Sequence, residues 1–421
     1  MSRIALRDRR EPTFDQGGIR NATTVVSSDP RVVELFGAPQ TSAGVAVSEV
    51  SAMRVSAVYA CVRIIGGAIA SLPIDIFRRD PTGQARVVNI QNPLWWVLNE
   101  QPHPRWTAAA MWKWLAKSWL LRGDGFAWIQ RDRAGTPIGL NPLHPASVQV
   151  ENRAGRLVYF FADPDNGDKR GVDQDDMIHL PGFGFDGQRG LSAIQWGARS
   201  GIGIALATDD FAGRFFGAGA MSRHALKVPG KLTDPQIVQL RQAFEDRYAG
   251  LDNAYRPMVL TEGVDVKELS LSATDAQLLE ARKFQVVDIA RAFGVPPFMI
   301  GDVEKTTAWG SGVEHMSLGF VRYTLQERLT EIEQELTRKL FRTATTFSRF
   351  NVEGLLRGDT AARAAYLREM VGGSQGPGII TQDEARRAEG FAPLGGDADK
   401  LYDPRSASLT ATTDTGAPAN A

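Results

Sequence analysis

Hydrophobic residues recur at helical spacing along two long stretches of the chain, 275–293 and 313–341. A period near 3.6 residues with one apolar face is typical of an amphipathic helix. The second stretch also places Glu327, Glu331 and Glu335 on a shared stripe that we expect to be exposed. The apolar positions are Leu278, Ala281, Val286, Ile289 and Phe293 in the first stretch, and Met316, Phe320, Tyr323, Leu325, Leu329, Ile332, Leu336 and Leu340 in the second.

The segment between these two predicted helices, residues 294–312, has a glycine at each end. Gly294 ends the first helix, and Pro296 and Pro297 prevent its continuation. Ordered loops held on rigid elements are a common place for function. The question is therefore what this loop is presented to.

The rest of the pattern alternates between helical and strand periods. It predicts a helix from Val55 to Leu72, then strand 74–77, helix 108–121, strands 126–131 and 148–151, and a helix from Leu191 to about Gly217. On that last helix Gly197, Gly201 and Ala205 recur every four residues, which lets another backbone approach closely. Strand pairs among helices indicate an α+β fold.

A smaller unit follows at residues 221–271. Thr233 with Gln236 three residues later predicts a capped helix that stops at Gly250, with Ile237, Leu240, Phe244 and Tyr248 facing inward. Strands 257–260 and 264–271 are expected to form a hairpin that turns at Glu262-Gly263. Nearer the end, helix 360–371 and a second helix capped by Thr381 and Glu384 are predicted.

Composition narrows the class of protein. A chain of 421 residues accommodates roughly two to three domains, and its formal net charge is zero, so no global charge steers it onto nucleic acid or an anionic membrane. One cysteine, Cys61, excludes a disulfide framework and any cysteine-clustered zinc site, and makes the cytoplasm the natural compartment. The N-terminus lacks the apolar stretch of a secretory signal, and Arg63 interrupts the longest apolar run, 55–77, so we expect no transmembrane segment.

Six of the nine tryptophans lie within a short part of the chain. Few basic residues interleave them, so they predict an aromatic core or subunit contact rather than a platform that stacks bases. They are Trp95, Trp96, Trp106, Trp112, Trp114 and Trp119.

Motifs that could indicate an enzyme lack the neighbouring elements and residues that the chemistry requires. Gly372 to Gly376 matches the nucleophile elbow around Ser374, but a helix is predicted before the serine, Pro377 follows it, and the last histidine, His315, precedes it. The five histidines never have the spacing i, i+4 of a zinc-binding helix. We therefore expect no catalytic residues, no metal and no cofactor, and keep a cytosolic serine hydrolase using Ser374 as the alternative.

A set of short motifs, spread from about residue 50 to 400, carries a resemblance. The motifs are 56–63 (SAVYACVR) with 70–73 (ASLP), 123–127 (GDGFA), 141–143 (NPL), 178–179 (IH) with 190–192 (GLS), 288–297 (DIARAFGVPP), 355–359 (LLRGD) and 380–386 (ITQDEAR). In this order the chain resembles the portal (head-to-tail connector) proteins of tailed bacteriophages, in the branch found in phages with long non-contractile tails and in gene-transfer particles.

The resemblance implies a portal fold and a division of the chain. It would make residues 46–190 an α/β wing, 191–220 and 272–293 stem helices, 221–271 a small α/β clip, 294–312 a tunnel loop, 313–341 a long helix of the wing and tunnel, and 342–403 a helical crown. Composition alone makes 1–45 a mobile arm and 404–421 a disordered tail.

The resemblance also implies a function. The chain would form a ring, which is a dodecamer in the family, at one capsid vertex of the virion after assembly in the host bacterial cytoplasm. Double-stranded DNA would pass through it during packaging and ejection. Implied partners are the major capsid protein, the terminase large subunit, and head-completion and tail connector proteins, with no membrane. The implied DNA-channel residues are Lys305, Thr306, Thr307, Trp309, Gly310, Ser311 and Gly312, and the implied docking residues of the clip are Lys231, Gln236, Arg247 and Asn253.

Local charge agrees with a channel that lets DNA slide. The loop carries Asp302 and Glu304 against Lys305, and the helix after it carries five glutamates against four basic residues. Each phosphate that a protein neutralises adds salt-sensitive affinity, and hence drag. We therefore expect contact with DNA to be weak and non-specific, with Lys305 in transient contact with phosphate at most. Whether the bulky Trp309 faces the channel or packs backward is open.

Overall fold

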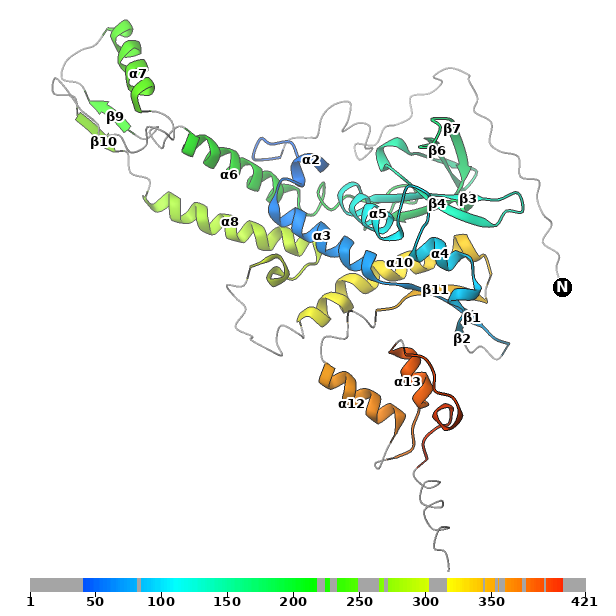
Figure 1. The fold of residues 1–421 in the computed structure, drawn as a ribbon. Helices are drawn as coiled ribbons and strands as arrows, with labels where there is room; N and C mark the ends of the chain where they lie inside the picture. The colour runs from blue at the N-terminus through cyan, green and yellow to red at the C-terminus, as the bar shows by residue number, and fades with distance from the viewer. Residues whose placement is uncertain are drawn as a thin grey trace, which may run out of the picture. The chain divides into compact units, whose positions relative to one another are not determined.

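A computed structural model describes residues 41–81, 85–217, 224–227, 233–248, 265–268, 272–302, 316–343, 345–352, 355, 360–372, 376–389 and 391–403. The chain has two compact units, Met1–Asn351 and Val352–Ala421. Figure 1 shows a mixture of helices and small sheets, which confirms the predicted α+β class. Within the described residues, none of the helices has the length and apolar character needed to cross a membrane.

Two packed helices form the centre of the first unit. These are α3 (Ser56–Ser71) and α5 (Ala108–Arg122), and Gly66 of α3 brings its backbone close to Ala116 of α5. The Thr107 hydroxyl caps α5 by accepting the N–H of Ala110, and Gly123 ends the helix with φ +85°. The short helix α2 (Glu49–Ala52) precedes this pair in the chain, and α4 (Leu94–Asn99) lies between its two members. Glu49 forms ion pairs with Lys117 and Arg122 of α5.

The first unit also contains three antiparallel sheets of three strands each. One has the order β11-β1-β2, with β1 (Ile74–Arg79) between β2 (Ala85–Val87) and β11 (Thr346–Phe350). The second has the order β4-β3-β8, formed by β4 (Pro137–Leu143), β3 (Asp124–Arg131) and β8 (Met177–Pro181). The third has the order β5-β6-β7, formed by β5 (Gln149–Arg153), β6 (Arg156–Ala162) and β7 (Lys169–Asp173).

A buried cluster joins the second and third sheets. Its members are Phe126, Leu143, Val148, Tyr159, Phe161 and Met177. Of the clustered tryptophans, Trp112 and Trp119 are buried, and each donates its indole N–H to a backbone carbonyl, Leu98 and Pro181 respectively. Packing is therefore the role of these two rings, as predicted; Trp96 stays exposed.

Helices α6 (Arg199–Gly217) and α8 (Ser272–Phe293) run antiparallel, side by side (Figure 1). The predicted close approach is confirmed, because a Cβ on Gly197 would lie 3.6 Å from Ala292 and one on Gly201 would lie 3.5 Å from Ile289. An ion pair between Asp209 and Arg282 joins the helices farther along. The prediction that α6 begins at Leu191 was wrong: residues 191–198 form turns, which the Ser192 hydroxyl fixes by donating to the Leu121 carbonyl.

The small unit between these helices contains α7 (Asp234–Tyr248), which begins directly after Thr233 as predicted. Gln236 accepts the Thr233 N–H, which is one of the two bonds of the predicted capping box. Its strand β10 (Asp265–Glu268) pairs with β9 (His224–Lys227), a strand that was not predicted. The expected partner strand, 257–260, lies outside the described residues. Ile237, expected to face inward, is exposed in the single chain.

The long helix after the loop is described from residue 316 onward and differs from a regular α-helix. It has a π-helical turn at Phe320–Leu325, then α10 (Gln326–Leu336), then a second π-helical turn at Thr337–Phe341. The wider turns rotate the side chains away from a 3.6-residue period. Tyr323, predicted to be apolar and inward, lies in the first π-helical turn and is consequently exposed. Glu327 and Glu331 of α10 are exposed as predicted, but Glu335 of the same helix is buried, because it packs against β8 and accepts the His179 N–H.

The second unit, taken by itself, contains α12 (Thr360–Val371) and α13 (Gln382–Ala388). Both were predicted, and the capping box of Thr381 and Glu384 is present. Asp383 is buried and accepts the backbone N–H groups of Leu394 and Gly395, each at 2.7 Å.

Three glycines bring three backbone segments of the first unit into direct contact. A Cβ on Gly190 would lie 2.1 Å from the Gly182 nitrogen and 2.3 Å from the Gly123 carbonyl oxygen. A Cβ on Gly123 would lie 2.5 Å from the Gly190 oxygen. The end of α5, the end of β8 and the segment that leads to α6 therefore meet where only glycine fits.

We expect Gly190→Ala to lower the free energy of unfolding by about 3 kcal/mol or more, because its methyl group overlaps backbone that cannot move aside. Gly67→Ala is the control, since a Cβ there meets nothing within 4 Å. The control should be neutral or stabilise by up to about 1 kcal/mol. Urea unfolding followed by tryptophan fluorescence measures both, and equal midpoints for the two variants would contradict the close packing.

Candidate functional site

The residues predicted to line a channel all lie outside the described part of the chain. This holds for Lys305, Thr306, Thr307, Trp309, Gly310, Ser311 and Gly312, and also for Lys231 and Asn253 of the predicted docking unit. Arg247 lies in α7, but its side chain is outside the description. Gln236 is described: it is exposed, and its amide oxygen accepts from the backbone N–H of Thr233 at 3.0 Å and from its hydroxyl at 2.9 Å.

The base of the loop is well defined on its N-terminal side. Gly294 ends α8 in the left-handed conformation, with φ +72°, and the Val295 N–H donates to the Ala290 carbonyl at 2.9 Å. A short 3₁₀ turn follows at Pro297–Ile300, and Gly301 ends it with φ +95°. The chain therefore leaves α8 through a fixed turn, as the glycine and proline pattern predicted.

Two side chains of the long helix hold this turn in place. The Thr324 hydroxyl donates to the Gly294 carbonyl. The Arg328 guanidinium donates to the carbonyls of Thr324, at 2.7 Å, and of Phe293, at 3.3 Å. We call Thr324 and Arg328 the loop clamp. They join the helices before and after the loop at the point where the loop begins.

The electrostatics of the clamp follow from its position. The carbonyl end of α8 carries partial negative charge, which a cation stabilises. Burial lowers the pKa of Arg328, while Glu327 and Glu331 nearby oppose this effect. The guanidinium is therefore a partly desolvated cation that donates hydrogen bonds to two backbone carbonyls. Sequence reasoning did not find Thr324 or Arg328, because contacts from side chains to distant carbonyls leave no periodic signal.

A cavity of about 530 Å³ opens beside the clamp. It is lined by the end of α5, residues 182–197, the end of α8 and residues 323–331. We call it the base groove. Phe183, Trp196 and Tyr323 lie around it with 89%, 63% and 77% of their surface exposed.

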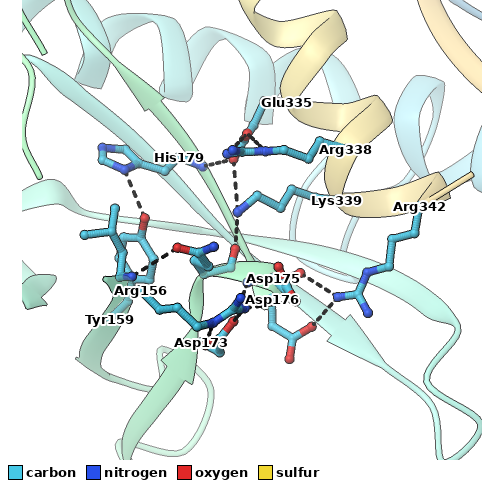
Figure 2. A network of polar contacts seen from close by, with 12 residues as sticks. Arg156, Tyr159, Asp173, Asp175, Asp176, His179, Glu335, Arg338, Lys339 and Arg342 are labelled. Carbon is cyan, nitrogen blue, oxygen red and sulfur yellow. Dashed lines mark hydrogen bonds and ion pairs between the residues drawn. The ribbon is translucent and has the colours of Figure 1, made fainter. Parts of the chain in front are cut away.

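The far end of the long helix is anchored by a network of polar contacts, shown in Figure 2. The buried Glu335 accepts the His179 backbone N–H at 3.1 Å and forms ion pairs with Arg338, at 2.6 Å, and Lys339, at 3.6 Å. Lys339 is 2% exposed and also donates to the Gln174 carbonyl (Figure 2). Burial lowers the pKa of Lys339, and Glu335 opposes that shift.

Other members of this network tie the end of the helix to the sheets. The Arg342 guanidinium donates to the Asp175 carbonyl at 3.0 Å and lies 3.4 Å from an Asp176 carboxylate oxygen (Figure 2). Arg131 donates to the same carboxylate of Asp176 at 2.6 Å and to the Lys339 carbonyl at 3.0 Å. These contacts hold the second π-helical turn of the long helix against β3 and the turn before β8.

His179 links this network to a buried carboxylate. Its ring nitrogens contact Asp124, at 2.9 Å, and the Tyr159 hydroxyl, at 3.1 Å. Asp124 also pairs with Arg189, at 3.2 Å, and accepts the Gly190 N–H at 2.9 Å. Both nitrogens of the buried ring are thus engaged, and the pair of Asp124 and His179 is a structural joint between β3, β6 and β8.

The described residues contain no group of three or more His, Cys, Asp or Glu side chains placed to hold a metal ion. The buried charges described above pair with one another or with backbone groups. The arrangement can present a loop and fix two helices.

Comparisons with known proteins agree with one another. The family model described as "Phage portal protein" matches residues 56–390. The portal protein of Enterobacteria phage HK97 is 36% identical over 351 residues, which cover 82% of this chain and 81% of that protein. A probable portal protein of Streptomyces phage phiC31 is 32% identical over 379 residues, covering 87% of this chain and 80% of that protein.

Solved structures show the same fold. The neck of a native gene transfer agent (GTA) particle, computed with C12 symmetry, matches with a TM-score of 0.56 at 22% identity, covering 87% of this chain and 99% of the neck chain. An HK97-family phage portal protein from Corynebacterium diphtheriae matches with a TM-score of 0.52 at 18% identity, covering 74% and 96%. The α+β fold is thus that of portal and neck structures.

We expect Arg328→Leu to destabilise the first unit by roughly 2 kcal/mol, because charged donors to two partly buried carbonyls are lost. Amide hydrogen exchange should rise in residues 290–302, which the clamp holds. Arg322→Leu, an exposed arginine on the same helix, is the matched control and should change stability by less than about 0.5 kcal/mol. Unchanged exchange in 290–302 for Arg328→Leu would remove the clamp role.

Proposed function

The chain belongs to the phage portal protein family, which is not an enzyme family, and on that premise we propose that it forms a ring at one capsid vertex through which double-stranded DNA passes. The observation that carries this proposal is the match of the family model over residues 56–390, together with a relative that is 36% identical over most of both chains. Portal proteins are components of the virion, and this chain is one by its membership. The expectation of a non-enzymatic protein agrees with that family.

A ring of twelve copies is the stoichiometry we propose. The support comes from the similar neck chain, whose structure was computed with C12 symmetry. Closed rings bury a different surface on each side of every copy. The long non-contractile tail type of the phage stays a prediction.

The division into parts follows the portal pattern. We propose a wing at 46–190, stem helices at 191–220 and 272–293, a clip at 221–271 and a tunnel loop at 294–312, followed by the long helix at 313–341. Because β11 pairs with β1, and the compact units divide after Asn351, we propose that the crown begins at Val352 rather than at 342.

Weak contact with DNA is the second part of the proposal. The tunnel loop begins from a fixed turn, and its composition carries two carboxylates against one lysine. DNA that must slide needs few neutralised phosphates, since each adds affinity that resists movement. We propose that copies of Lys305, Thr306, Thr307 and Trp309 surround the passing duplex.

The docking partners of the ring are also proposed. The chain carries no Walker-type phosphate loop, so the packaging motor must be a separate terminase. We propose that the terminase docks at the clip, around Lys231, Arg247 and Asn253, and that head-completion and tail connector proteins later take its place. The major capsid protein would surround the wing.

The alternative, a hydrolase using Ser374, finds no support. Ser374 lies outside the described residues, but the element before it is α12, a helix, where the nucleophile elbow requires a strand. We do not carry this alternative further.

We expect the purified chain to form rings with an axial hole in negative-stain images. Deleting 308–312 should leave ring yield unchanged, because the clamp and both helices remain, and should lower the DNA retained per particle in a packaging assay. Deleting five residues at 412–416 serves as the control and should leave both unchanged.

A chain that stays monomeric in the presence of capsid protein would overturn the portal proposal. Normal packaging by the loop deletion would instead remove only the channel role of the loop. The two results are separable because ring yield and packaged DNA are measured independently.

A further inference from the structure

The base groove combines open volume with uncovered aromatic surface. Phe183, Trp196 and Tyr323 lie around a cavity of about 530 Å³, and each exposes more than half of its surface in the single chain. Single exposed apolar residues are ordinary, but several large ones around one hollow mark a surface that another protein covers. Their concentration next to the loop clamp is the first argument.

The charges at the edge of the groove form the second argument. Glu327 and Glu331 stand four residues apart on α10, both exposed, and like charges at this spacing repel. Burial and the neighbouring Glu327 raise the pKa of Glu331. Two arginines also line the groove: Arg328 partly opposes this shift, and Arg291 pairs with Asp288. Within the described residues neither glutamate forms an ion pair, and Arg328 donates to backbone carbonyls. With Asp288 counted, the edge holds three carboxylates against two guanidinium groups, a net charge of −1, and therefore suits a basic partner.

A second copy of this chain offers such a partner. Ring closure requires two unlike surfaces on each copy, one for each neighbour. Arg63 of α3 and Lys113 of α5 are exposed, and Tyr59, one helical turn before Arg63, exposes half of its ring. No residue of α3 lines the base groove, so both surfaces can be used at once. The chain thus carries both an aromatic hollow with a weakly acidic edge and a basic, aromatic helix surface.

We propose that the base groove is one half of the contact between neighbouring copies in the ring, and that it receives a basic surface of the next copy. This inference rests on the proposed portal ring and names the surface that builds it. The neighbour covers Tyr323 and Trp196 and places cations beside Glu327 and Glu331. Because the groove adjoins the loop clamp, each loop base is then braced by the next copy.

Two substitutions test the surface without disturbing the fold of a single copy. Tyr323→Asp and Glu331→Arg change side chains that point to solvent in the single chain, so the thermal melting of the monomer should stay within a few degrees of the unaltered chain. The fraction of chain in rings, measured by sedimentation and negative-stain imaging, should fall strongly for both. Glu369→Arg, an exposed glutamate on α12, is the matched control and should form rings normally.

A photo-crosslinking amino acid at position 323 provides a second measurement that does not depend on loss of assembly. In purified rings, irradiation should join two copies covalently, seen as a band of twice the chain mass. Three results would overturn the inference while leaving the ring itself intact. The first is that verified rings give only intrachain products, and the second is that the products contain co-expressed capsid protein instead. The third is a normal ring yield from Tyr323→Asp. Absence of rings from the unaltered chain would overturn the portal proposal first, and this inference with it.

Discussion

Asp124 is the buried charge on which the first unit is organised. Its carboxylate meets His179 of β8, Arg189 and the Gly190 N–H, so the sheet and the segment leading to α6 share one anion. A buried carboxylate is stable only when paired and hydrogen-bonded, which these three partners provide. Because the backbone N–H of His179 donates to Glu335, the joint also extends to the long helix. At its other end that helix holds the end of α8 through Thr324 and Arg328. A chain of specific contacts therefore fixes the base of the loop relative to the sheet.

Much of this fold was predictable from the sequence where local signals decide it. The bounds of α12 and the caps of α7 and α13 follow from residues close together in the chain, and Gly294 with its prolines ended α8 as predicted. The features that the sequence did not predict are those determined by contacts between residues far apart in the chain. The pairing of β10 with β9 and that of β1 with β11 depend on residues far apart in sequence. The first π-helical turn displaced Tyr323 from the face that a 3.6-residue period assigns to it, and the contact of Glu335 with β8 buries a residue that the same period leaves exposed.

The candidate site likewise has one part that the sequence predicts and another that it does not. Glycine and proline spacing predicted that a loop is presented, whereas the residues that hold it, Thr324 and Arg328, carry no pattern of their own. The motifs of the resemblance have a physical meaning in the structure: Gly123-Asp124-Gly125, Ile178-His179 and Gly190 converge on one joint. One arrangement thus explains residues that are far apart in the sequence. The glycines allow the backbone segments to touch, and the Asp124 carboxylate accepts hydrogen bonds from His179 and the Gly190 N–H at that point.

The pairing of β11 with β1 has a consequence for synthesis. Strand β1 leaves the ribosome early, but its partner at residues 346–350 follows only after almost all of the first unit. Contacts so distant in sequence form slowly, because a long loop must close before they contribute stability. During that interval the edge of β1 that β11 will cover presents unpaired N–H and carbonyl groups, the kind of edge that joins other chains. Strand β11 is the last strand of the first unit among the described residues. A nascent copy can therefore complete this sheet only after residues 346–350 have been made and can reach β1.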